Sequence, residues 1–270
     1  MDNRAKETWG SGDVYEQYVG RWSRHVAVEF LAWLDVGTGS SWGDVGCGSG
    51  VLAEGILSRS DPVSILATDR AAGFVRAARE RFQDDRVQFS VGDARALAWK
   101  SNACDATVSG LVLNFVSDPK AMAAEMVRVT RPGGIVAVYV WDYAGGMQMM
   151  RHFWDAAVEI NPQDSRLDQA ERFPICQPAP LESLFQEAGL ESVRVRPIDI
   201  VTVFRDFDDY WNPFLGKQGA APTYLASLSS VLQDRIREAL RVRLPTASDG
   251  SIRLNARAWA VQGNVPRCAP

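Results

Sequence analysis

The chain has 270 residues, of which 46% are hydrophobic and 23% charged, so it can bury a sizeable core and is not a disordered tail. Its formal net charge is −4, whereas a dedicated nucleic-acid binder usually presents a basic face, so we expect no nucleic-acid partner. Its four cysteines are widely spaced without a CxxC pair, which argues against a metal cluster and against a disulfide framework.

The N-terminal residues, the apolar runs and the length of the chain predict its compartment and its number of domains. Residues 1–12 are polar and unlike a signal peptide, and no run approaches the about 18 apolar residues that a membrane span needs. We therefore expect a cytoplasmic protein without a membrane span. A length of 270 residues suits one large α/β domain with an appended lid, or at most two small domains.

The predicted elements begin with a helical segment over residues 14–34. From residue 41 to residue 140, short strand-like runs alternate with helical periods, as βαβ units require. One helical stripe is formed by Phe74, Ala78 and Phe82 at four-residue spacing. A further helix is expected to start at 118–119 and to stop at a tight turn over 131–134. The strands of this region are predicted at residues 41–45, 64–68, 87–91, 106–109 and 135–140.

The second half of the chain is expected to close the sheet. A strand rich in valine and isoleucine is followed by a helical, irregular segment and then by a last strand. This order predicts a hairpin at the edge of the sheet, with a helical lid inserted in it. The predicted elements are a long helix from near residue 146, a short helix at 180–188, a strand at 191–204, the lid at 206–245 and a closing strand at 252–261.

The most informative stretch is a glycine-rich loop at residues 44–50, Asp-Val-Gly-Cys-Gly-Ser-Gly, between a predicted strand and a predicted helix. Glycines let the chain turn sharply and let a ligand approach the backbone. About twenty residues on, a second apolar run ends in Asp69, where a carboxylate can accept hydrogen bonds from ribose hydroxyls.

Dinucleotide-binding oxidoreductases carry a similar loop, with a third glycine or alanine three residues after the second glycine. Counted from Gly46, that position is Val51, which fails; counted from Gly48, it is Ala53, which passes. The register that starts at Gly46 is favoured, because it also gives Asp44 and Gly46 a role. Since this register does not fit the oxidoreductase fingerprint, the oxidoreductase interpretation is disfavoured. An NAD(P)-dependent oxidoreductase remains the alternative.

Five segments in order resemble the class I S-adenosylmethionine (SAM)-dependent methyltransferases, especially the ubiquinone/menaquinone-methylase-like (type 11) group. The resemblance implies an α/β, Rossmann-like, doubly wound sheet of seven strands, with SAM as cofactor and S-adenosyl-L-homocysteine as product. It implies one domain over residues 1–270, made of a helical cap (14–34), a core (41–204), a lid (206–245) and a closing strand (252–261). The segments that carry it are 44–50, 67–69, 91–94, 104–109 and 125–134.

The resemblance also implies roles for single residues. The glycine loop would wrap the amino-acid part of SAM, Asp44 would order that loop or reach the SAM ammonium, and Asp69 would bind the ribose. Asp93 would accept a hydrogen bond from the adenine, although a plain turn carboxylate is the alternative. Tyr18 and Trp22 share a helix face with Tyr15, which is either a lid over SAM or ordinary core. The implied cofactor-binding set is Asp44, Gly46, Cys47, Gly48, Gly50, Asp69, Arg70, Gly92, Asp93, Ala94, Gly110, Leu111, Tyr18 and Trp22.

Methyl transfer is an in-line displacement in which the cofactor carries the chemistry, so the protein mainly aligns the reactants and excludes water. A general base is needed only if the acceptor must lose a proton. The candidates are Asn114, Asp142 and Tyr143, at the carboxyl ends of the predicted fourth and fifth strands, where doubly wound sheets bind ligands. Asp142 is equally well explained as the cap of the following helix.

Two departures from the family pattern concern packing and substrate. Gly43 stands inside the first predicted strand, where an interior glycine weakens packing. Asn114 and Phe115 stand where many relatives have His-His or His-Trp after the fourth strand. Aromatics in the predicted lid indicate a pocket for a small organic acceptor, aromatic or quinone-like, unless they merely anchor the lid. A non-catalytic SAM-binding protein remains a further alternative, and the lid aromatics in question are Phe207, Tyr210, Trp211 and Phe214.

Overall fold

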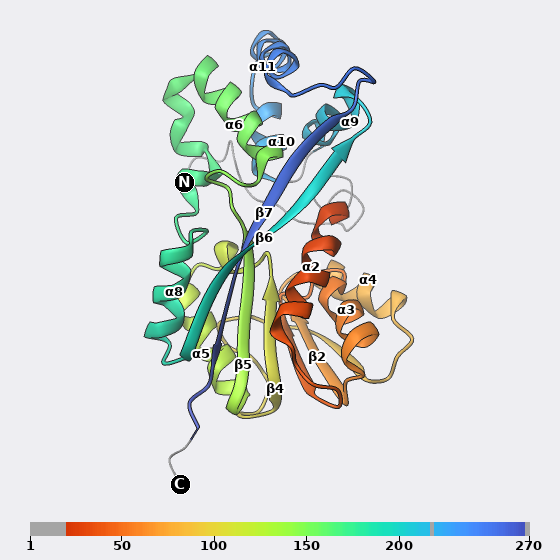
Figure 1. The fold of residues 1–270 in the computed structure, drawn as a ribbon, viewed down its shortest axis with the longest axis vertical. Helices are drawn as coiled ribbons and strands as arrows, with labels where there is room; N and C mark the ends of the chain where they lie inside the picture. The colour runs from red at the N-terminus through yellow and green to blue at the C-terminus, as the bar shows by residue number, and fades with distance from the viewer. Residues whose placement is uncertain (1–19, 217–218, 268–270) are drawn as a thin grey trace. The chain divides into compact units, whose positions relative to one another are not determined.

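The computed structural model describes residues 20–216 and 219–267. In these residues seven strands form one sheet, in the order β3-β2-β1-β4-β5-β7-β6 (Figure 1). The fold class predicted above, a doubly wound α/β sheet of seven strands, is confirmed. The strands are β1 (Ser41–Val45), β2 (Ser64–Asp69), β3 (Val87–Val91), β4 (Cys104–Gly110), β5 (Thr130–Trp141), β6 (Glu191–Phe204) and β7 (Ile252–Asn264).

The helices alternate with the strands through the first half of the chain and cluster between β5 and β7 in the second. Helix α5 starts as predicted, because the Asp118 carboxylate accepts a hydrogen bond from the Ala121 N–H at 3.0 Å and Pro119 takes the first helical position. The helices are α2 (Arg21–Leu34), α3 (Val51–Ser60), α4 (Ala72–Arg81), α5 (Pro119–Val129), α6 (Gln148–Ile160), α7 (Gln169–Arg172), α8 (Pro178–Glu187), α9 (Phe207–Trp211), α10 (Ala220–Ala226) and α11 (Ser230–Arg243), with 3-10 turns η3 (Leu113–Phe115), η4 (Pro162–Leu167) and η5 (Asn212–Leu215).

The parallel part of the sheet places the glycine-rich loop. Strand β1 pairs in parallel with β2 on one side and with β4 on the other, β3 pairs with β2, and β5 pairs with β4. The chain therefore crosses from β3 back over β1 to reach β4. The carboxyl ends of β1 and β4 form the point where the strand order reverses, which is where open α/β sheets bind ligands.

The end of the sheet is a hairpin, as predicted, with the helical insert between its strands β6 and β7. Strand β7 runs antiparallel to β5, since the Gly133 N–H donates to the Val265 carbonyl at 2.8 Å and the Val265 N–H donates back to Gly134 at 2.9 Å. The closing strand was predicted to end at residue 261, and it ends at Asn264. Residues 262–264 lack the apolar side chains by which a strand is predicted, so the prediction stopped at residue 261. Backbone pairing with β5 extends the strand through them.

Other predicted boundaries also differ from the structure: the strand predicted at 106–109 spans Cys104–Gly110, and the one predicted at 135–140 spans Thr130–Trp141. The turn expected at 131–134 lies within β5, which begins at Thr130, because the same pairing with Val265 holds Gly133 and Gly134 in the sheet. Helix α6 begins at Gln148, after a turn at 143–146, which confirms the predicted start near residue 146. Helix α8 spans Pro178–Glu187 instead of 180–188. The predicted N-terminal helix is described from residue 21; residues 14–19 lie outside the described ranges.

The chain divides into two compact units. The first takes residues 1–22, 141–174 and 199–258, and the second takes residues 23–140, 175–198 and 259–270. The single domain over residues 1–270 stays a prediction, because a domain is a unit that folds alone, which compactness does not test. Within the described ranges, no helix combines the length and the apolar character needed to cross a membrane.

Candidate functional site

The glycine-rich loop connects β1 to α3 in the second unit. Gly46, Gly48 and Gly50 have φ values of +78°, +52° and +87°, a left-handed backbone that glycine adopts without steric cost. The N–H groups of Gly46 and Cys47 both donate to the Thr68 carbonyl, at 2.7 and 2.9 Å, which ties the loop to the end of β2. Burial raises the pKa of the Cys47 thiol, so this cysteine is an unreactive part of the loop.

The three glycines face different surroundings. A Cβ atom on Gly46 would lie 2.7 Å from Val112 Cγ1, and one on Gly50 would lie 2.6 Å from the ring of Phe82. A Cβ atom on Gly48 would meet no heavy atom of the described residues within 4 Å. Gly46 and Gly50 are therefore required by the packing of the protein itself, whereas Gly48 leaves its backbone accessible to a ligand.

Asp44 is a buried carboxylate without a counter-charge, two residues before the first glycine of the loop. The residue is 0% exposed, and neither carboxylate oxygen has a hydrogen-bond partner among the described residues. Burial, helped by the charge of Asp69, raises its pKa from 3.8 to about 7. The N–H of Ala53 shifts the pKa the other way, but it does not meet hydrogen-bond geometry with either oxygen and offsets the rise only in part. A buried ionised carboxylate is costly unless it is paired, so Asp44 fits a cationic ligand group.

Asp69, at the end of β2, already accepts two backbone hydrogen bonds. Its Oδ2 accepts from the Gly48 N–H at 3.0 Å, and its Oδ1 accepts from the Ala71 N–H at 2.8 Å. Each carboxylate oxygen retains capacity for a further hydrogen bond, so both are able to accept from a ligand hydroxyl. Asp69 therefore also orders the glycine loop, a role that spacing along the chain did not reveal. The neighbouring Arg70 is exposed.

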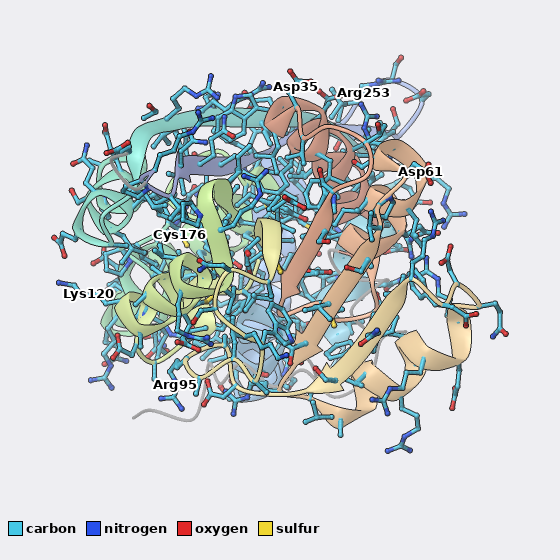
Figure 2. The ribbon with its side chains drawn as sticks, turned by 90° about the horizontal axis from the view of Figure 1, so that it is seen from below. Asp35, Asp61, Arg95, Lys120, Cys176 and Arg253 are labelled. Atoms are coloured by element: carbon cyan, nitrogen blue, oxygen red, sulfur yellow. The ribbon has the colours of Figure 1, made fainter. Side chains whose placement is uncertain are left out.

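Asp93 follows β3 and is held by an arginine that the sequence reasoning missed. Arg95, which is labelled in Figure 2, donates from Nε and Nη2 to the two carboxylate oxygens, with an Nη2–Oδ2 distance of 2.7 Å. Its Nη1 donates to Ser117 Oγ at 2.8 Å. This pairing lowers the pKa of Asp93 to about 2, so the carboxylate is ionised at neutral pH. Gly92 is needed beneath it, because a Cβ there would lie 2.6 Å from Thr68 Oγ1, and Ala94 is half-buried.

The end of β4 lies against the same loop. A Cβ atom on Gly110 would lie 2.5 Å from the hydroxyl of Tyr139, so only glycine fits there. Leu111 has a φ of +61°, which costs roughly 1–2 kcal/mol for a residue with a side chain, and its N–H donates to the Tyr139 carbonyl at 2.8 Å. Backbone strain of this kind concentrates at functional sites. The left-handed turn at Leu111 places the side chain of the next residue, Val112, against Gly46.

The three catalytic candidates have different partners. Asp142, which is 7% exposed, accepts from the Gly145 N–H at 3.2 Å and from the Gly146 N–H at 2.9 Å, which closes the turn before α6. The prediction that Asp142 caps the following helix was wrong, because Met147 stands at the N-cap of α6 without a side-chain hydrogen bond and Asp142 closes the turn before it. Tyr143 is buried beside Phe173, with ring centroids 5.7 Å apart. Asn114 is 8% exposed, and its amide nitrogen has no acceptor among the described residues.

The aromatic residues of the predicted lid pack within the first unit. Phe214 stacks on Phe153 with ring centroids 4.6 Å apart, and the Tyr210 hydroxyl donates to the Met149 carbonyl at 2.8 Å. Phe207 and Trp211 stack at 6.3 Å. These contacts agree with the alternative in which the aromatics anchor the lid. A pocket lined by them stays a prediction.

The N-terminal aromatic face is described only in part. Tyr15 and Tyr18 lie outside the described residues. Trp22 is buried, with its ring edge-on to Phe204 at a centroid distance of 5.6 Å. Within its own unit Trp22 therefore makes the contacts of a core residue, and its role as a lid over a cofactor stays a prediction.

Other residues of the five motif segments hold the fold. Glu125 accepts from the Leu97 N–H at 2.7 Å, and Arg128 donates to the carbonyls of Leu97 and Trp99, each at 2.9 Å. The expectation that Gly43 weakens packing was wrong, because the ring of Trp99 fills its missing side-chain space at 2.9 Å from a Cβ position. Glu125 and Arg128, which we call the clamp, therefore hold residues 97–99, and Trp99 in this segment covers Gly43 of β1.

Comparison with known proteins relates this site to a family. Residues 43–138 match the family described as "Methyltransferase domain". The chain is 36% identical over 137 residues to tRNA (carboxymethyluridine(34)-5-O)-methyltransferase ALKBH8 of Macaca fascicularis, covering 47% of this chain and 19% of that protein. It is 35% identical over 95 residues to demethylmenaquinone methyltransferase of Renibacterium salmoninarum, covering 35% of this chain and 38% of that protein.

The chain thus spans 19% and 38% of the lengths of these two relatives. Among solved structures, it is similar to phosphoethanolamine N-methyltransferase 2 of Haemonchus contortus, which was solved in complex with S-adenosyl-L-methionine. The TM-score is 0.61 at 17% identity, covering 94% of this chain and 56% of the other. At this identity the likeness shows a shared fold.

Proposed function

We propose that this chain, whose residues 43–138 match the methyltransferase domain family and whose sheet has the class I methyltransferase fold, is a SAM-dependent methyltransferase acting on a small organic acceptor. SAM would supply a methyl group on a positively charged sulfur. The acceptor atom would take this methyl group by in-line displacement, with S-adenosyl-L-homocysteine as the other product. The protein's task is then to hold the reactants in line and to exclude water.

The observation that carries the proposal is the unpaired carboxylate of Asp44. It is fully buried, has no hydrogen-bond partner among the described residues and precedes a loop whose Gly48 leaves room for a ligand. The amino-acid part of SAM offers an ammonium group, which would supply the missing counter-charge directly or through water. The donor set therefore fits this cofactor.

The remaining residues of the site fit the other parts of SAM. Asp69 has acceptor capacity for the ribose hydroxyls, and the ionised Asp93 suits an amino group of the adenine. Gly110 and Leu111, at the end of β4, would pass beneath the cofactor, where a side chain on Gly110 has no room. A nicotinamide dinucleotide lacks an ammonium group for Asp44, so the oxidoreductase alternative is less well supported.

The class of methyl acceptor is proposed from the hydrogen bonds of Asp142 and from the net charge of the chain. The carboxylate of Asp142 is already shared between two backbone N–H groups, so it is poorly placed to remove a proton. This favours an acceptor atom that is ionised or lone-pair-bearing before transfer. A net charge of −4 supports a small molecule over a polyphosphate, and the menaquinone-related relative supports an aromatic or quinone-like one. The tRNA-modifying relative makes RNA the competing acceptor.

Calorimetry followed by turnover tests the proposal. We expect binding of SAM and S-adenosyl-L-homocysteine and no binding of NAD, then methylation in a panel of small aromatic and quinone-like acceptors. RNA, DNA and protein extracts serve as polymer substrates beside that panel. Binding of NAD in place of SAM would overturn the cofactor assignment. Methylation of a polymer alone would overturn the small acceptor, and binding without any turnover would identify a non-catalytic SAM-binding protein.

A further inference from the structure

Arg95, two residues after Asp93, takes up most of the capacity of this carboxylate to accept hydrogen bonds. Oδ1 of Asp93 accepts from the Arg95 backbone N–H at 2.9 Å and from its Nε at 3.0 Å. Oδ2 accepts from Nη2 at 2.7 Å and shares the Nε group at 3.2 Å. A carboxylate oxygen accepts about two hydrogen bonds, so among the described residues Oδ1 is fully used and Oδ2 retains room for one further donor.

The same arrangement of three residues occurs at the other end of β3, and the two differ in one contact. Arg86, directly before β3, donates from its backbone N–H and its Nε to Asp84 Oδ1, each at 3.0 Å. Its Nη2 donates to Asp84 Oδ2 at 2.8 Å. Its Nη1 then donates to a second carboxylate, Asp61 Oδ1, at 2.8 Å. At the amino end of β3 the arginine therefore joins two exposed carboxylates.

At the carboxyl end of β3, the Nη1 atom of Arg95 has a different partner. It donates to Ser117 Oγ at 2.8 Å. Ser117 lies between η3 and Asp118, the N-cap of α5, in the segment that follows β4. Because β3 and β4 are both parallel to β1 and β2, their carboxyl ends lie at the edge of the sheet where ligands bind. Arg95 therefore joins two loops of the candidate cofactor site, and all these residues belong to the second unit.

The stability of the fold does not account for this pair. The side chains of Arg95 and Asp93 are 44% and 48% exposed, and an exposed ion pair contributes little to the free energy of unfolding. The pair does fix the direction of the carboxylate, because two parallel N–H groups bind both of its oxygens in one plane. It also lowers the pKa of Asp93 to about 2, so at neutral pH the fixed group only accepts hydrogen bonds.

We propose that Arg95 is a positioning residue for the base of the cofactor, which makes the site prefer a purine with an exocyclic amino group over one with an oxygen in its place. This inference rests on the proposed function, in which Asp93 accepts a hydrogen bond from the adenine amino group. With Arg95 in place, the remaining acceptor position of Oδ2 has one direction, so an N–H donor is bound there and a carbonyl oxygen is repelled. Without Arg95 the exposed carboxylate is free to turn, and the site loses part of this preference.

The test compares S-adenosyl-L-homocysteine with S-inosyl-L-homocysteine, in which an oxygen takes the place of the amino group of the base. Calorimetry measures the affinity of both ligands for wild type, Arg95→Gln and Arg95→Lys. The matched control is Arg86→Gln, which removes the same pairing at the amino end of β3. Asp93→Ala, alone and combined with Arg95→Gln, tests whether Arg95 acts through this carboxylate. Thermal unfolding checks that each variant is folded.

We expect wild type to bind S-adenosyl-L-homocysteine about 10- to 100-fold more tightly than the inosyl analogue, because only the amino group can donate to Asp93. Arg95→Gln should reduce this ratio by about 3- to 10-fold, through weaker binding of the adenosyl ligand. Arg95→Lys should reduce it less, because lysine keeps the charge but lacks the two-pronged edge. Arg86→Gln should leave the ratio unchanged. In Asp93→Ala, the additional change Arg95→Gln should alter the ratio no further.

An unchanged or increased ratio in Arg95→Gln would overturn the inference. An equal loss in Arg86→Gln, or a further loss in the Asp93→Ala background, would overturn it as well. If Arg95→Gln does not fold, an unchanged ratio in Arg95→Lys has the same meaning. Failure of the proposed function looks different, because wild type itself would then not bind S-adenosyl-L-homocysteine, and the inference would fail with it. Wild type that binds both ligands equally would refute the positioning of the base while leaving the cofactor assignment intact.

Discussion

The glycine-rich loop and the clamp around α5 both belong to the second unit and both carry motif residues, yet their polar groups are treated differently. In the clamp, Glu125 and Arg128 satisfy each other and the backbone of residues 97–99. In the loop, Asp44 is buried without a hydrogen-bond partner, and a Cβ on Gly48 would meet no heavy atom within 4 Å, in both cases among residues 20–216 and 219–267. A family motif therefore marks two kinds of residue, those that complete the fold and those that the fold leaves for a ligand.

The largest expected effect is on SAM affinity at Gly48, and a control at a second glycine with positive φ distinguishes loss of ligand contact from backbone strain. Gly48→Val should abolish SAM binding, by more than about 1,000-fold or about 4 kcal/mol, because its side chain would occupy the space left beside the loop. Gly39→Val is the matched control, since Gly39 also has a positive φ, +74°, and no heavy atom within 4 Å. Calorimetry should show normal SAM affinity in that control. Equal affinity in both variants would place the cofactor elsewhere.

Gly46→Ala should give the opposite outcome, a loss of stability. Its Cβ would overlap the Val112 side chain in a left-handed backbone, which together cost roughly 3 kcal/mol. Denaturant unfolding measures the change in the free energy of unfolding. Gly48→Ala, which meets no neighbour, should lose only the backbone part. If the two variants were equally stable, the distinction between a packing glycine and a ligand-facing glycine would fail.

Asp69→Ala should weaken SAM binding by about 1.5–3 kcal/mol, the scale for hydrogen bonds to a charged group. Both its oxygens already hold backbone N–H groups of the loop and of α4, so a small loss of stability should accompany the loss of affinity. Asp84→Ala, which removes an exposed carboxylate paired with Arg86, serves as the control. Unchanged SAM affinity in folded Asp69→Ala would exclude the ribose role.

Asp44→Asn should raise stability and lower affinity. The folded pKa of Asp44, about 7, exceeds its ordinary value of 3.8, so the folded protein retains a proton that the unfolded chain has released. The stability that this group contributes is therefore complete below about pH 4 and is lost as the pH rises through about 7. At about pH 8 the ligand-free variant should be more stable than wild type by on the order of 2 kcal/mol.

That stability gain should vanish near pH 4, as thermal unfolding across the pH range would show. In calorimetry at about pH 8, the same variant should bind SAM more weakly, because the neutral amide offers no counter-charge to the ammonium. A stability difference that does not depend on pH would contradict the buried, unpaired carboxylate.

The smallest effect is expected in the clamp. Arg128→Lys should reduce stability by about 1 kcal/mol, because lysine cannot reach Glu125 and the carbonyls of Leu97 and Trp99 together. SAM affinity should not change. Lys120→Ala, which removes an exposed ion pair with Glu187, should leave both properties unchanged. A large loss of SAM affinity in Arg128→Lys would show that the clamp and the loop are not separable.

Local patterns were sufficient for the order of elements. The alternation of strand-like and helical periods and the Asp118-Pro119 start of α5 depend on neighbouring residues, so the sequence itself contains them. The glycine loop was found for the same reason, since a left-handed turn after a strand demands glycine. Strand β7 was predicted too short, because the backbone of β5, far away in the chain, extends it through polar residues.

The sequence alone predicted a glycine-rich loop, the carboxylates beside it and an alternation of strands and helices, because spacing and residue type are properties of short segments. The number of seven strands was implied by the family resemblance. The tertiary structure decided which of the predicted residues make contacts within the protein and which keep polar groups free to bind a ligand. It brings Val112 onto Gly46, fills the space beside Gly43 with Trp99 and gives the Asp142 carboxylate to the turn before α6. Within the part of the chain that the structure describes, it leaves the carboxylate of Asp44 without a hydrogen-bond partner. These outcomes depend on contacts between residues distant in the chain, which no local pattern records.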